Sequence, residues 1–185
     1  MAEYYLISQL PSLDGISENA TVPITENQFE ELCERLLGKK TQRILKEITL
    51  LPPKKPKSSG SALIDAWNEK ERNLRLALCK VRSEKMSKIF ASENESFSDE
   101  YIKVSKAALE MENPMEAEKY LNNYRLQILE TLRPIDNFSE EYIYYYGIKL
   151  KLIQRIRQFD TVAGEEAYKS IYNSILNGYR LEAKQ

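Results

Sequence analysis

The feature that most constrains this chain of 185 residues is a long helical pattern, Ala62 to Met86, whose apolar stripe carries a charge. Apolar residues recur at the spacing of one helical face, namely Trp67, Leu74, Leu78 and Val81. Glu71 falls in the middle of this stripe, and Arg75 follows one turn later, where it can pair with the carboxylate. Because a buried carboxylate is costly unless it is paired, we expect a polar network that ties helices together or faces a partner. Asn73 belongs to this expected network, and the adjacent Arg72 is a candidate contact for a partner.

Other helix boundaries carry recognisable start and stop signals. Thr25 and Gln28 form a capping box, and Asn113 followed by Pro114 is typical of a helix start. Gly38 and Gly178 are expected to end helices as C-caps. Helices are expected at about residues 26–37, 40–51, 62–86, 98–111, 114–132, 139–160 and 164–177. We therefore predict an all-α fold, an irregular bundle of about six to seven helices with two long central ones. The segment Tyr4 to Leu10 is compatible with either a strand or a short helix.

A proline- and lysine-rich stretch at residues 52–60 interrupts the helical pattern. It divides an N-terminal helical segment, 1–51, from a main helical bundle, 61–185, and the two are expected to form one compact domain. Adjacent prolines favour polyproline II and the Ser-Gly end is flexible, so the stretch is predicted to be a solvated linker or loop. The alternative is that Lys54, Lys55 and Lys57 contact an acidic partner.

A tyrosine-rich segment, Phe138 to Phe159, is apolar over much of its helical circumference, which predicts a central helix. Lys149 lies within the apolar face. One interpretation is a core packed through tyrosines, with Lys149 solvated at its tip or paired with Glu71. The other is that Tyr144 and its two neighbours expose a binding face, since tyrosine is enriched at interfaces.

Composition argues against most catalytic sites. The chain has no histidine, which excludes Ser-His-Asp and Cys-His sites, and no glycine-rich nucleotide-binding motif. Cys33 and Cys79 are far apart and are expected to be buried free thiols. The acidic residues at 93–100 match no EF-hand. A net charge of -1 argues against nucleic-acid binding. We expect no enzyme activity, no cofactor and no metal.

The expected location is the cytoplasm. Met1-Ala2-Glu3 is not the basic start of a signal peptide, and no apolar run reaches the length of a membrane span. Two free cysteines fit a reducing compartment. Any membrane association is expected to be peripheral, at the inner face, through a complex.

Three pieces of the sequence resemble known families. Tyr4–Leu13 resembles the opening of an uncharacterised bacterial family encoded beside V-type ATP synthase genes. Tyr146–Arg155, with Phe159-Asp160 and Gly164–Ala167, resembles the C-terminal signature of the same family. Glu71–Arg75 is similar to a glutamate, asparagine and arginine helix in the C subunit of V-type ATPases, which is called d in eukaryotes.

This resemblance implies a non-catalytic role in an ion-transporting complex. The C subunit is an all-helical adaptor that seats the rotor shaft on the membrane ring, and this chain is much shorter. The resemblance implies a reduced adaptor, an accessory subunit or an assembly factor. Its expected contacts with rotor or stalk subunits are Arg72 and Arg75, if they face outward, and Lys54, Lys55 and Lys57. The alternative is a generic helical scaffold or regulator with an unrelated protein partner. The oligomeric state is left open.

Overall fold

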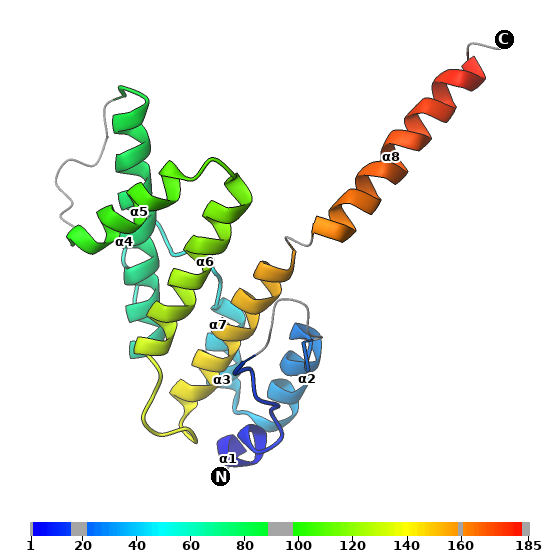
Figure 1. The fold of residues 1–185 in the computed structure, drawn as a ribbon. Coiled ribbons are helices and arrows are strands. Elements are labelled where there is room, and N and C mark those ends of the chain that lie inside the picture. The colour runs from blue at the N-terminus through cyan, green and yellow to red at the C-terminus, as the bar shows by residue number, and fades with distance from the viewer. Residues whose placement is uncertain (1, 16–21, 89–97, 159–160, 183–185) are drawn as a thin grey trace.

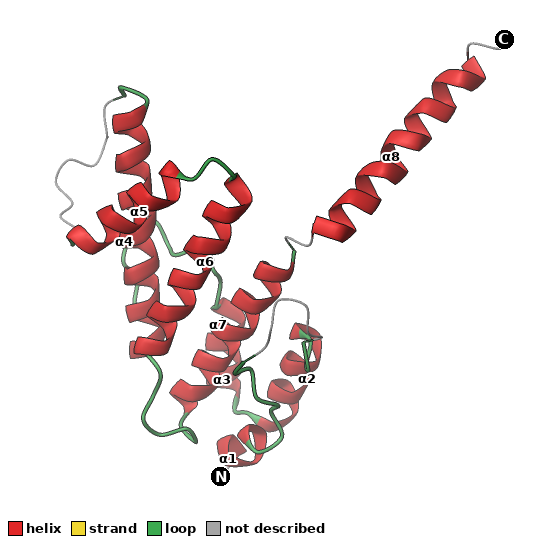
Figure 2. Ribbon diagram, viewed as in Figure 1, coloured by secondary structure: helices red, strands yellow, loops and turns green. Residues whose placement is uncertain are grey.

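The computed structural model describes residues 2–15, 22–88, 98–158 and 161–182. This part of the chain contains eight helices and no strand, so the predicted all-α class is confirmed (Figures 1 and 2). The helices are α1 (Ala2–Ile7), α2 (Glu26–Leu36), α3 (Lys39–Glu47), α4 (Ala62–Lys85), α5 (Asp99–Glu110), α6 (Pro114–Thr131), α7 (Glu140–Arg157) and α8 (Thr161–Glu182). The segment whose secondary structure the sequence leaves open begins as helix α1.

Helix α7 occupies the centre of the bundle, as its broad apolar face predicts. It contacts α1, α2, α3, α4 and α6, and every residue from 143 to 150 is buried. Helix α4 packs along α5, α6 and α7 on the other side of the bundle (Figure 1).

Three clusters of buried side chains form the core. One surrounds Trp67 and Tyr145 between α3, α4, α6 and α7, and a second surrounds Phe29 and Tyr146 between α1, α2 and α7. The third surrounds Leu74 between α4, α5 and α6. The N-terminal segment and the main bundle therefore bury apolar surface against the same helix, α7.

Most predicted helix starts are confirmed by their hydrogen bonds. Thr25 Oγ1 accepts from Gln28 N at 3.2 Å, and Gln28 Oε1 accepts from Thr25 N at 2.9 Å, which completes the capping box. Asn113 Oδ1 accepts from Met115 N at 3.0 Å, and Ser139 Oγ accepts from Tyr142 N at 3.3 Å.

The two predicted glycine C-caps are wrong. Gly38 has a φ of -69°, and it stands at the start of α3 rather than in the left-handed conformation that ends a helix. Gly178 lies inside α8, which continues to Glu182. Helix α7 also ends earlier than expected, at Arg157.

The predicted linker is partly ordered, because its end folds back onto the first turn of α4. Ser59 donates to Asp65 Oδ1 from both its backbone N and its Oγ, each at 2.7 Å. Ser58 Oγ donates to Asp65 Oδ2 at 3.0 Å, and Gly60 takes a φ of +87°, which favours glycine. The three lysines of this loop, Lys54, Lys55 and Lys57, are exposed.

Helix α8 extends away from the bundle (Figure 1). Within the described residues, no helix combines the length and the apolar character that crossing a membrane requires.

Candidate interaction surface

Glu71 lies at the centre of a buried network between α4 and α6. Its side chain is 1% exposed and accepts from Arg75 Nε at 2.7 Å, as the i, i+4 spacing predicts. Arg125 of α6 is its second cation, with Nε 3.2 Å from Oε1 and 3.0 Å from Oε2. The carboxylate is thus held by two guanidinium groups, and this pairing offsets the cost of its burial.

The network continues through α6 to α7. Arg125 Nη1 donates to Asn122 Oδ1 at 2.9 Å and lies 3.5 Å from Glu118. Glu118 also accepts from Arg155 of α7 at 2.6 Å. These contacts tie α4, α6 and α7 together, so we assign this network a structural role.

Sequence reasoning missed Arg125 and Asn122, although both are buried on the inner face of α6. The signal was present, because they stand at i and i+3 beside the apolar Leu121, Ile128 and Leu129. Asn73 was expected in the network instead. No hydrogen bond of the described residues joins it to Glu71 or Arg125, so this part of the prediction is wrong.

Lys149 belongs to a separate network, so its predicted pairing with Glu71 is also wrong. Its Nζ donates to Asp14, to Glu130 at 2.7 Å and to the Tyr145 hydroxyl at 3.2 Å. Burial alone would lower the pKa of Lys149, but these hydrogen bonds raise it above its ordinary value. This network fastens the loop after α1 and the end of α6 to α7.

Tyr144 does not belong to an exposed binding face. Its side chain is 2% exposed, and burial raises its pKa to about 12. Tyr145 and Tyr146 are buried as well. The prediction of Tyr144 as a partner contact is therefore wrong, and the alternative of a core packed through tyrosines is confirmed.

The surface brings together two of the predicted contact residues. Lys57 of the loop and Arg72 of α4 line the same open groove, which has a volume of about 640 Å³. The other lining residues are Pro53, Pro56, Ser58, Ala62, Asp65, Ala66, Asn68 and Glu69. Lys54 and Lys55 stand on the same loop but do not line the groove.

The charges of this groove are not equally available to a partner. Asp65 already accepts hydrogen bonds from Ser58 and Ser59, whereas Lys57 and Glu69 are exposed and Arg72 is half-buried. The loop lysines add further positive charge beside the groove. The groove itself carries both signs of charge, so it suits a polar partner surface with acidic groups opposite Lys57 and Arg72 and none opposite Glu69.

The other candidate sites give weaker evidence of a function. Among the described residues, no group of three or more Cys, Asp or Glu side chains could hold a metal ion. Part of the acidic stretch at 93–100 lies outside the described residues. Cys33 is buried, and burial raises the pKa of its thiol to about 12, but Cys79 is exposed, contrary to the prediction.

Comparison of the chain with known protein families, with curated proteins and with solved structures finds no match to any of them.

Proposed function

We propose that this protein is a non-catalytic helical interaction protein that acts with a V-type ATP synthase, as an adaptor, an accessory subunit or an assembly factor. The observation that carries the proposal is the open polar groove between the 52–60 loop and α4, where Lys57 and Arg72 face the same space. The partner class rests on the resemblance of the chain's ends and of Glu71–Arg75 to proteins of that system.

The segment Glu71–Arg75 has two different faces in the fold. Glu71 points into the core and holds Arg125, and Arg75 pairs with it there. Arg72 lies on the adjacent side of α4 and lines the groove. One short helical segment therefore both fixes α4 in the bundle and presents a guanidinium group to a partner.

The partner expected at the groove is a rotor or stalk subunit with an acidic surface. Exposed charge pairs contribute mainly to association rate and specificity, and salt weakens them. Binding through this groove should therefore fall as the salt concentration rises.

An affinity pull-down from native cells tests the proposal. The tagged chain is compared with Arg72→Glu and with the triple variant Lys54→Glu, Lys55→Glu, Lys57→Glu, at low and moderate salt, with mass spectrometry as the readout. A matched control, Lys39→Glu, Lys103→Glu, Lys106→Glu, makes the same charge change at exposed positions elsewhere. We expect V-type ATP synthase subunits with the wild type and the control, and roughly tenfold less with either groove variant.

Two other outcomes would change the proposal. An unrelated protein bound through the same groove would retire the ATP synthase partner and leave the alternative, a helical scaffold or regulator. Recovery of the same proteins with wild type and groove variants would show that this groove is not the binding site.

A further inference from the structure

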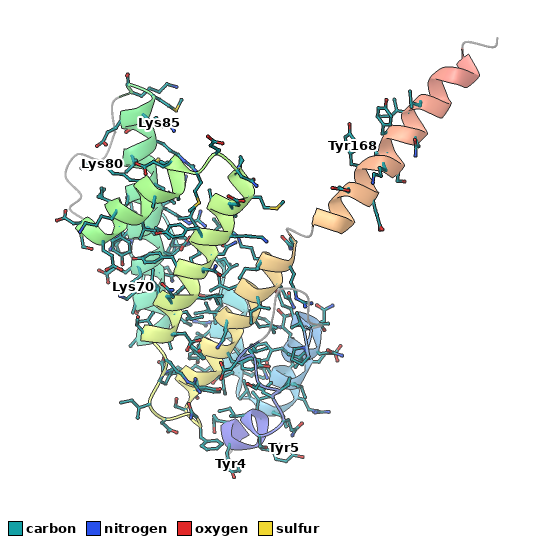
Figure 3. All side chains as sticks on the ribbon, in the orientation of Figure 1. Tyr4, Tyr5, Lys70, Lys80, Lys85 and Tyr168 are labelled. Atoms are coloured by element: carbon teal, nitrogen blue, oxygen red, sulfur yellow. The ribbon has the colours of Figure 1, made fainter. Side chains whose placement is uncertain are left out.

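Helix α8 carries an apolar stripe that nothing in the described structure covers. The stripe is formed by Tyr168, Ile171, Tyr172 and Ile175, which are 51–68% exposed. Tyr168 is visible on the extended helix in Figure 3. The hydrogen bond, ion pair and ring contact of residues 164–176 all lie within α8.

This helix is amphipathic. The four stripe residues follow the i, i+3, i+4, i+7 spacing of one face. Glu166, Ser170 and Asn173 lie on the opposite face by the same period. A helix of this kind normally buries its apolar face against another element.

The composition of α8 also indicates that it needs a covering surface. Gly164 and Gly178 each cost a helix about 1 kcal/mol relative to alanine, and the β-branched Ile171 and Ile175 are weaker helix formers than leucine. Helices of such composition are marginal in water and gain most of their stability from packing.

A second copy of the same helix fits the stripe if it runs antiparallel. A two-fold axis between Ile171 and Tyr172 places Ile171 opposite Tyr172 of the other copy, and Tyr168 opposite Ile175. Each aromatic ring then meets an aliphatic side chain. A parallel pair would instead place Tyr168 against Tyr168 and Ile171 against Ile171, with no alternation of large and small side chains.

Charge does not oppose this pairing. The charged residues nearest the stripe are Glu165 and Lys169, and they pair within their own helix at 3.5 Å. This flank therefore brings no net charge to the contact, and the repulsion between identical copies is small.

The exposed area of the stripe limits the affinity of the helix pair. Half to two thirds of each stripe side chain faces solvent, which leaves roughly 400–500 Å² on each copy. Complete burial of both stripes would remove at most about 1,000 Å² from solvent, which is about the lower limit for a specific interface. We propose that α8 is a self-association helix, which forms an antiparallel pair with α8 of a second copy and gives a weak dimer with a Kd of about 1–100 µM. This proposal does not depend on the partner proposed for the groove.

Sedimentation of the full chain over roughly 1–200 µM tests this proposal. The wild-type mass should rise from 21.6 kDa toward twice that value with concentration. Ile171→Glu places two like charges at the centre of the pair and should weaken association at least tenfold. Asn173→Glu adds the same charge on the polar face and should leave association unchanged. Neither site belongs to a core cluster, so the bundle should fold in both variants.

Disulfide trapping tests the direction of the pair. In a Cys79→Ser background, a Tyr168→Cys chain mixed with an Ile175→Cys chain should form a mixed disulfide faster than either chain forms one with itself. A chain that is monomeric at all concentrations, or a dimer that Ile171→Glu does not weaken, would overturn the proposal. Equal trapping of Tyr168→Cys with itself would overturn the antiparallel arrangement.

Discussion

At the scale of single residues, two ionic networks, each built around a buried charge, fix how the helices meet. Glu71 joins α4 to α6 through Arg125, while Lys149 joins α7 to Glu130 and to Asp14. The two networks share no residue. Each keeps a charged group inside the fold by giving it oppositely charged partners, so the loss of one partner should cost more than the loss of an exposed ion pair.

Glu71→Gln should lower the free energy of unfolding by about 3–5 kcal/mol, because Arg125, which is 4% exposed, would lose its main counter-charge. Urea unfolding measures this loss. Glu84→Gln, at an exposed position of the same helix, should change stability by less than about 0.5 kcal/mol. A loss of similar size in both variants would contradict the structural role of the network.

A double-mutant cycle should separate the two networks. Glu71→Gln and Lys149→Met have no shared partner, so their effects on unfolding should add within about 0.5 kcal/mol. Lys149→Met and Glu130→Gln remove the two ends of one ion pair, so their combined effect should be smaller than the sum by about 1 kcal/mol or more. A coupling energy of about 1 kcal/mol or more between Glu71→Gln and Lys149→Met would instead indicate that these two residues interact directly, which the structure does not show.

Lowering the pH should weaken the Lys149 network. A hydrogen bond from Lys149 lowers the pKa of Asp14. Burial alone would raise the pKa of Glu130, but hydrogen bonds from Lys149 and Tyr145 outweigh it and lower that pKa too. A carboxyl group with a lowered folded-state pKa stabilises the fold above its unfolded pKa, near 4, and loses this contribution as pH falls through the folded value.

The difference in unfolding free energy between wild type and Lys149→Met should therefore narrow from about pH 5 downward. Urea unfolding at several pH values measures it. Lys103→Met, at an exposed position, should show a constant difference over the same range. A gap that stays constant in Lys149→Met as well would mean that Lys149 does not lower these two pKa values.

These residues also show which ion pairs can be predicted from the sequence and which cannot. The Glu71–Arg75 pair was predictable because it lies within one helix, where spacing determines which side chains meet. Arg125 is 54 residues from Glu71, and Asp14 is 135 residues from Lys149. Helical periodicity shows that Glu71, Arg125 and Lys149 face the core, but not which helix or loop will lie opposite them.

At the scale of elements, polar N-caps were better guides than glycines. Thr25, Asn113 and Ser139 each accept a backbone N–H that the helix leaves unsatisfied, so their position has a direct energetic cause. A glycine permits a helix end without requiring one, and Gly178 accordingly lies inside α8. The end of the loop before α4 is held by Asp65, six and seven residues along the chain from Ser59 and Ser58, and the composition of the loop alone gave no signal of this contact.

Asp65→Ala should release the end of this loop, because it removes the acceptor for Ser58 and Ser59. Limited trypsin digestion should then cleave after Lys57 several-fold faster, since proteolysis follows the population of the open form. Asp99→Ala removes the equivalent first-turn acid of α5 and should leave this cleavage unchanged. Equal rates in wild type and Asp65→Ala would mean that these hydrogen bonds do not hold the loop.

At the scale of the whole molecule, the fold separates a packed body from a projecting helix. The centrality of α7 was predictable, because a helix that is apolar around most of its circumference needs neighbours on several sides. The separation of α8 was not, because its amphipathic pattern is the same as that of a helix packed in the bundle. Periodicity indicates that a face is to be buried, and only the fold shows whether this chain supplies the covering surface.

Removal of the residues after Gln158 should therefore leave the body intact. None of the three core clusters contains a residue of α8 in the described part of the chain, so the free energy of unfolding at low micromolar concentration should change by less than about 0.5 kcal/mol. Urea unfolding of the shortened chain, compared with the full chain, measures this. At high concentration the full chain alone should gain stability, because dimerisation favours the folded state by mass action. If truncation instead unfolds the body, α8 supports the fold, and its exposed stripe would belong to this chain's own core rather than to a second copy.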